Sequence, residues 1–129
     1  MKSIFKKGDK KTFSKKVLQE DTANFESGQV HPFYSTFAIA RDAEWTGRLF
    51  VLDMKEEDEE GIGTLVKIEH KAPAFIGDVI EFTSTLVSLI GNELMTAFIA
   101  RCDKKIIATG VTGQKVLKKE KIRKLLKMV

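Results

Sequence analysis

The chain has 129 residues, 43% of them hydrophobic and 31% charged, with 9 glycines and 2 prolines. This length fits a single domain, expected over residues 1–129, and the composition excludes disordered and collagen-like proteins. The net charge of +4 is unevenly placed: residues 1–16 and 115–127 are basic, whereas residues 53–60 carry six acidic side chains and one lysine.

Cysteine usage and hydropathy indicate a cytoplasmic protein. The single cysteine, Cys102, excludes an internal disulfide and a thiolate metal cluster, so a reducing compartment is expected. Residues 82–92 form the longest nearly uncharged stretch, which is far shorter than the roughly 20 residues of a membrane span. No apolar block follows the first lysines, so we expect no secretory signal and no membrane partner. No RNA-binding signature accompanies the basic ends, so we expect no nucleic-acid partner.

The first third of the chain mixes a strand, a turn and a loop. Residues 11–20 alternate like a half-exposed strand, and residues 21–25 are expected to form one helical turn. Gly28 and the pair His31-Pro32 predict a loop, because the residue before a proline avoids the helical region.

One long helix is predicted over residues 37–54, with Ser35 or Thr36 as its cap. Apolar side chains lie on nearly all of its sides, which is typical of a buried helix. Glu44 lies three residues after Arg41 and four before Arg48, a spacing that favours ion pairs with both. The acidic run that follows is expected to be a solvated loop.

The second half alternates as strand after strand. Strands are predicted over four segments and a basic helix over the last one: 63–72, 79–90, 93–102, 106–117 and 119–129. The fold class is therefore α+β, with an antiparallel five-stranded sheet wrapped around one long central helix, a hot-dog fold with its core over about 10–118. The strand at 93–102 is apolar on both faces, which favours a homodimer or a higher homo-oligomer.

Three side chains could carry chemistry, and each also has a structural interpretation. His70 ends the inward row of its strand, where an imidazole could act as a general base or serve as a structural histidine. Thr36 could cap the helix, or its hydroxyl could work beside the free amides of the helix start. Glu44 could be held in ion pairs, or it could orient His70 or a water molecule.

Three segments carry a family resemblance: EDTANFESGQVHPFYSTFAIARDAE, GTLVKIEHKAPAFIGDVIEF and KKIIATGVTGQKVL. They resemble the hot-dog thioesterases related to fluoroacetyl-CoA thioesterase. The resemblance implies that Thr36, Glu44 and His70 form the catalytic group of a dimeric enzyme. Thr36 would position or perform the attack on the thioester carbonyl, His70 would act as acid and base, and Glu44 would tune His70 or the water.

The expected function is therefore hydrolysis of an acyl-CoA thioester with a small or short acyl group. Tyr34, Ser35, Phe37 and Gly77 are the predicted substrate-binding residues. No metal is expected, and no cofactor either, because CoA is part of the substrate. Phe37 stands where the family has a proline, so the acyl group stays open. The alternative is a non-catalytic hot-dog protein that binds acyl-CoA.

Overall fold

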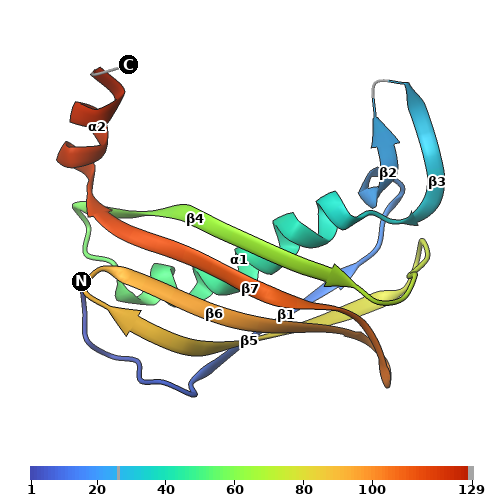
Figure 1. Cartoon of the computed structure of the whole chain (residues 1–129), viewed down its shortest axis with the longest axis horizontal. Coiled ribbons are helices and arrows are strands. Elements are labelled where there is room, and N and C mark those ends of the chain that lie inside the picture. Colours follow the sequence, from blue (N-terminus) through green and yellow to red (C-terminus); the bar gives the residue numbers. More distant parts are fainter. Residues whose placement is uncertain (26, 128–129) are drawn as a thin grey trace.

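A computed structural model of the chain describes residues 1–25 and 27–127. Its main sheet has the strand order β1-β5-β6-β7-β4, and every neighbouring pair is antiparallel. The strands are β1 (Lys10–Lys16), β4 (Glu59–His70), β5 (Val79–Ile90), β6 (Glu93–Cys102) and β7 (Lys105–Lys118). The sheet curves around the helix α1 (Thr36–Met54), and the short helix α2 (Lys119–Lys127) follows β7 (Figure 1). The predicted hot-dog fold is confirmed.

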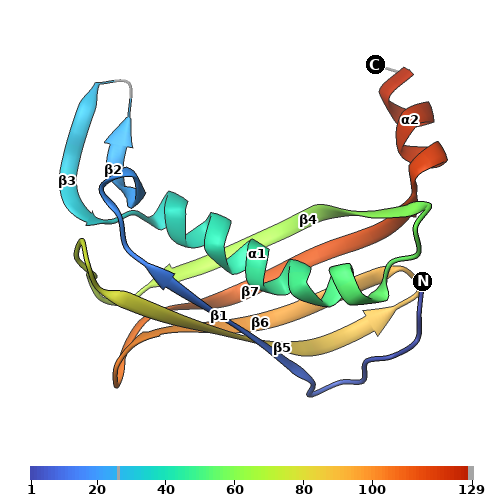
Figure 2. The same cartoon turned by 180° about the vertical axis from the view of Figure 1, so that it is seen from behind.

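The helix α1 begins where the sequence indicates and packs on the concave side of the sheet (Figure 2). Ser35 caps it, because its side chain accepts a hydrogen bond of 3.0 Å from the amide of Ala38. Ile39, Ala43 and Phe50 are fully buried against the strands. Burial of this face, at about 25 cal/mol per Å² of apolar surface, fixes the helix along the sheet.

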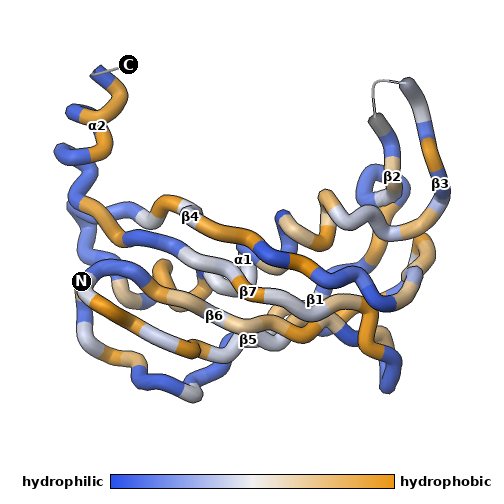
Figure 3. Tube along the Cα trace, viewed as in Figure 1, coloured by the Kyte–Doolittle hydropathy of each residue, from blue (hydrophilic) through white to orange (hydrophobic). Residues whose placement is uncertain are grey.

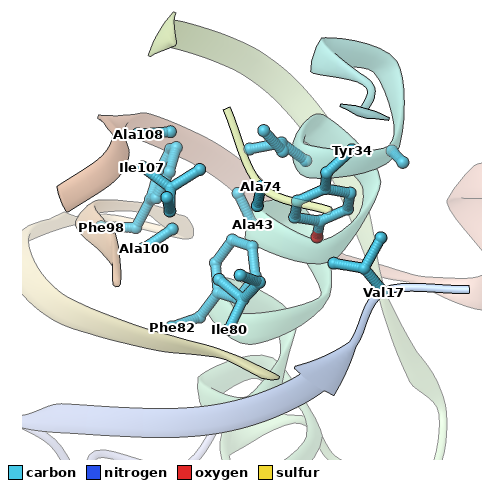
Figure 4. Close-up of a cluster of buried hydrophobic side chains, with 12 residues drawn as sticks. Val17, Tyr34, Ala43, Ala74, Ile80, Phe82, Phe98, Ala100, Ile107 and Ala108 are labelled. Atoms are coloured by element: carbon cyan, nitrogen blue, oxygen red, sulfur yellow. The ribbon is translucent and has the colours of Figure 1, made fainter. Parts of the chain in front are cut away.

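The core has two clusters, one under each half of α1. The larger cluster surrounds the first turns of the helix, and Figure 4 shows the ring of Tyr34 among its side chains together with Phe82 and Phe98. The smaller cluster lies under the last turns and contains Phe50 and Met54. The larger cluster therefore supports the end of the molecule where α1 begins and β4 ends.

The strands β7 and β4 approach each other closely at Gly110, which pairs with Ile68 across the sheet. A Cβ atom at Gly110 would lie 1.9 Å from the backbone oxygen of Lys67 and 2.7 Å from a ring carbon of Phe98. Only glycine fits here, because the neighbouring backbone occupies the space of a side chain.

The predictions for residues 21–32 were wrong. A 3₁₀ turn covers Gln19–Asp21, and the strands β2 (Thr22–Phe25) and β3 (Gly28–Tyr34) form a separate antiparallel hairpin instead of a helical turn and a loop. The Asp21 side chain accepts from the amide of Leu18 and so closes the turn backwards rather than starting a helix. Pro32 is tolerated because each strand of a two-stranded sheet has a free edge.

The acidic run is only partly a solvated loop, which corrects the expectation for residues 55–60. The strand β4 begins at Glu59, whose side chain is buried and accepts a hydrogen bond of 2.9 Å from the amide of Glu56. Lys118, its partner across the sheet, lies 3.9 Å away.

Across the described residues, no helix is long and apolar enough to cross a membrane.

Candidate active site

The first residue of α1 and the last residue of β4 meet at one end of the sheet. Thr36 Oγ1 lies 3.0 Å from His70 Nδ1, although 34 residues separate them in the chain. This contact depends on the cap, because Ser35 and not Thr36 satisfies the helix amide at Ala38. The Thr36 hydroxyl is therefore free to face the imidazole.

The two nitrogens of the His70 ring have different surroundings. Nδ1 contacts the Thr36 hydroxyl, and Nε2 is buried. Nε2 has no hydrogen-bond partner among the described residues. When Nδ1 accepts from the Thr36 hydroxyl, the ring proton sits on Nε2, and Nδ1 is the basic atom. A second proton on the ring would therefore come from the hydroxyl or from a water beside it.

The start of α1 also offers donors to a developing oxyanion. The first amides of a helix have no acceptor within the helix, and here those of Thr36 and Phe37 precede the amide that Ser35 caps. These amides and the positive end of the helix dipole favour negative charge next to the Thr36 hydroxyl. The site thus brings together a hydroxyl, an imidazole and a helix N-terminus.

Glu44 lies apart from this pair. Its carboxylate packs on β4, where a Cβ atom at Gly63 would come 2.5 Å from Oε1. The predicted ion pairs were wrong, because Arg48 binds Glu60 at 2.7 Å and Arg41 binds other aspartates. Across residues 1–25 and 27–127, Glu44 has no ion pair, so its carboxylate is available for chemistry.

A shallow hollow surrounds this carboxylate on the outer face of α1. Its volume is about 440 Å³. Besides Glu44, the hollow is lined by three apolar residues and two arginines: Phe37, Ala40, Trp45, Arg41 and Arg48.

Gly63→Ala should lower kcat/KM for a thioester about tenfold, because a methyl group there displaces the carboxylate of Glu44 and misplacement by about 1 Å is costly in catalysis. The stability should change by less than about 1 kcal/mol, since Gly63 is exposed and the displaced atoms end a flexible side chain. Steady-state kinetics and thermal unfolding of the same sample measure both quantities. Unchanged kinetics would show that the position of Glu44 against Gly63 does not matter.

The four predicted substrate contacts occupy different surroundings. Phe37 is 75% exposed and lines the hollow. Tyr34 is fully buried, and its hydroxyl donates to Asp42, which argues against the predicted substrate contact. Ser35 is the buried helix cap, and the Gly77 amide donates to the Val17 carbonyl in a turn with a positive φ of 93°.

A buried charged network beside the site was missed. Arg41 bonds both Asp42 at 3.0 Å and Asp21 at 2.7 Å, and Lys15 reaches Asp21 at 3.1 Å. Burial and the neighbouring Asp42 carboxylate raise the pKa of Tyr34, whose hydroxyl therefore stays protonated. The network joins the β2–β3 hairpin to the first turns of α1. The only part of this network that the sequence could indicate is the adjacent pair Arg41-Asp42, because Asp21 lies 20 residues from Arg41 in the chain.

The network predicts acid-sensitive stability. Burial alone would raise the pKa of Asp21, but hydrogen bonds from Arg41, the Leu18 amide and Lys15 outweigh it and hold that pKa below its usual value. Such a group stabilises the fold above its unfolded pKa, about 4, and this contribution is lost as pH falls through the lower folded pKa. Asp21→Asn should therefore cost about 2 kcal/mol at pH 7, a modest value because Arg41 is half exposed.

Urea unfolding at pH 7, 5, 4 and 3 measures this effect. The native chain and the Asp21→Asn variant should converge in stability toward pH 3. Protonation of Asp21 removes the same negative charge from the native chain that the substitution removes from the variant. A constant difference at every pH would contradict the assignment.

Among the described residues, no three His, Cys, Asp or Glu side chains are arranged to hold a metal ion.

The sequence and the fold were compared with known proteins. A sequence profile described as Fluoroacetyl-CoA-specific thioesterase matches residues 17–120 of the chain. No curated protein sequence gives a significant match.

Several solved structures share the fold over nearly the whole chain. A hypothetical protein of Thermus thermophilus, described as a thioesterase superfamily member, is 31% identical over 98% of this chain and 93% of its own, with a TM-score of 0.92. A variant of the fluoroacetyl-CoA-specific thioesterase FlK is 20% identical over 98% of each chain, with a TM-score of 0.90. A hot-dog-like protein from Thermanaerovibrio acidaminovorans is 23% identical over 95% and 90%, with a TM-score of 0.86.

Proposed function

This chain belongs to the fluoroacetyl-CoA-specific thioesterase family, and from that premise we propose that it hydrolyses an acyl-CoA thioester with a small or short acyl group. The observation that carries the proposal is the contact of 3.0 Å between Thr36 Oγ1 and His70 Nδ1. Related FlK structures were determined with fluoroacetate and CoA and with acetyl-CoA, which supports a CoA thioester here. CoA is part of the substrate, so the reaction needs no cofactor.

The proposed reaction uses His70 as the proton carrier. Nδ1 takes the proton of the Thr36 hydroxyl, or of a water held by it, as the oxygen attacks the thioester carbonyl. The amides at the start of α1 stabilise the oxyanion. When the C–S bond breaks, His70 returns the proton to the CoA sulfur. If Thr36 itself attacked, a water then hydrolyses the acyl-threonine by the same proton route.

Glu44 acts on the water in this proposal. It lies eight residues after Thr36, about 12 Å along the helix, so it cannot bond Thr36 directly. Its carboxylate faces Gly63 on β4 and is free of ion pairs within the described residues. In a dimer this carboxylate would orient the attacking water at the Thr36–His70 pair of the second copy, because the pair of its own chain lies too far along the helix.

A homodimer completes the proposal. The strand β4 is an outer strand of the main sheet, so one of its edges is unpaired over 12 residues. Its exposed apolar side chains include Ile62 and Val66. A long apolar edge of this kind pairs readily with another strand. Antiparallel pairing of β4 with β4 of a second copy would join two sheets and cover Gly63 and Glu44.

The location proposed is the cytoplasm, in keeping with the single cysteine.

The test is thiol release from a panel of acyl-CoAs of increasing chain length, followed with a chromogenic thiol reagent. Turnover should be greatest for acyl groups of two to four carbons. Acyl-CoAs that raise the unfolding temperature without any turnover would instead favour the alternative of a binding protein. Sedimentation velocity of the same sample measures the oligomeric state independently.

A further inference from the structure

The helix α2 exposes two large apolar side chains, Leu125 at 46% and Leu126 at 70%. We propose that α2 packs on the second copy, beside the end of the partner's β4, and that its basic face binds the phosphates of CoA. This inference rests on the proposed function and on the β4-paired dimer. It adds a binding site for the CoA phosphates to the hydrolytic end of the partner.

The surface of α2 is divided into two faces. None of its nine residues is buried, and Leu126 is 70% exposed. Ile122, Leu125 and Leu126 are spaced to form one stripe about 100° wide, the width of a face that packs on another surface. The other six positions carry one acidic side chain, Glu120, which pairs with Lys124 at 3.4 Å, and five basic side chains: Lys119, Lys121, Arg123, Lys124 and Lys127. Figure 3 shows both kinds of residue on α2.

The topology places α2 at the beginning of β4 and the site at its end. Lys118, the residue before α2, pairs with Glu59, the first residue of β4. His70, the last residue of β4, pairs with Ala108 at the other end of β7. Figures 1 and 2 show that α2 and the β2–β3 hairpin extend beyond the sheet in the same direction, on the side of β4 and at opposite ends of it.

Two-fold symmetry then brings α2 to the partner's site. In an antiparallel pair of β4 strands, the beginning of one strand lies opposite the end of the other. The α2 helix of one copy therefore lies beside the β2–β3 hairpin and the His70 end of its partner. That end offers an apolar contact for the stripe of α2, because Val30 on β3 is 64% exposed.

The charge of α2 matches what this end lacks. A hollow of about 240 Å³ beside His70 has Lys71 as its basic side chain, and Lys71 is paired with Glu69 at 3.2 Å. CoA carries a pyrophosphate and a 3′-phosphate, which need several cationic partners. Helix α2 supplies them with a net charge of +4, from five basic side chains and Glu120.

A cross-link tests the placement. In a Cys102→Ser background, we combine Leu126→Cys with Val30→Cys and oxidise the protein mildly. Helix α2 and strand β3 lie at opposite ends of the molecule (Figure 1), so a bond between a cysteine on one and a cysteine on the other joins two chains and gives a covalent dimer on a non-reducing gel. The matched control pairs Leu126→Cys with Ser14→Cys on β1, the far edge of the sheet. No dimer, or equal dimer in both proteins, would overturn the placement.

Calorimetry with CoA itself tests the phosphate site, whether or not the chain turns over a thioester. Changing Lys121, Lys124 and Lys127 together to Gln should weaken CoA binding about tenfold at low salt, a loss typical of three exposed charge contacts. The control changes the exposed Lys6, Lys7 and Lys16 to Gln, which lowers the net charge equally and should leave binding unchanged.

Equal weakening in both triple variants would reduce the effect to net charge and overturn the site. A second result would also overturn the proposal. If the native chain binds phosphatidylglycerol vesicles and the cysteine variant forms no covalent dimer, α2 is assigned to a membrane surface. Absence of turnover with a positive cross-link and a specific loss of CoA affinity would contradict the proposed hydrolysis and leave the α2 site standing.

Discussion

Replacing His70 with alanine should lower kcat/KM for the best acyl-CoA by about 100-fold or more, the usual contribution of a general base. The loss should fall mainly on kcat, because His70 acts on the proton that moves in the transition state. Its Nδ1 is the atom within 3.0 Å of the Thr36 hydroxyl. Steady-state kinetics with the thiol assay measure the effect, and circular dichroism with thermal unfolding confirms that the variant is folded.

A double substitution separates a catalytic pair from two independent contacts. If Thr36 and His70 work as a unit, Thr36→Val combined with His70→Ala should lose little more activity than His70→Ala alone. Additive losses would mean that the contact of 3.0 Å between them is not used in the reaction. Full activity of His70→Ala would remove the proposed mechanism altogether.

Gly110→Ala should destabilise the fold by about 3 kcal/mol or more, which exceeds the usual cost of overpacking because the obstacle is backbone. The added methyl would lie 1.9 Å from the Lys67 carbonyl oxygen. The clash is relieved only if β4 and β7 separate. Their separation breaks hydrogen bonds between the two strands close to His70. Urea denaturation measures the loss of unfolding free energy.

Gly113→Ala on the same strand is the matched control. Its Cβ atom would meet the Met95 sulfur at 2.8 Å and the Thr64 hydroxyl at 3.0 Å. Both are ends of side chains, which can move, so we expect a cost of about 1 kcal/mol. Comparable costs at the two positions would show that the sheet yields at Gly110 more easily than its geometry indicates.

The sequence predicted the elements whose patterns are long and regular. The helix over 37–54 and the hairpin of 79–90 with 93–102 agree with α1, β5 and β6, because burial imposes a period on each of them. The β2–β3 hairpin was missed because it is short, contains Pro32 and is held by distant partners. Asp21 anchors it through Arg41, and no local pattern reveals that bond.

The candidate site could be predicted only in part. Thr36, Glu44 and His70 stand out from their positions in the sequence pattern; the resemblance implies their joint catalytic roles, which stay predictions. The contact of Thr36 with His70 follows from strand and helix ends that meet only in the folded chain. The expected ion pairs of Glu44 failed because both arginines find partners elsewhere, Arg41 at Asp21 and Asp42 and Arg48 at Glu60. Helical spacing allows such a pair but does not reveal its competitors.

The two neighbouring hydroxyls at the start of α1 have different tasks, since only one residue can be the cap. Ser35 holds the amide of Ala38, and this leaves Thr36 for His70. Without Ser35, a helix that began one residue later would take the Thr36 hydroxyl as its own cap and withdraw it from the imidazole. The proposed reaction therefore depends on where the helix starts. Ser35 would then control the reaction through the position of the helix start, with the rest of the fold unchanged.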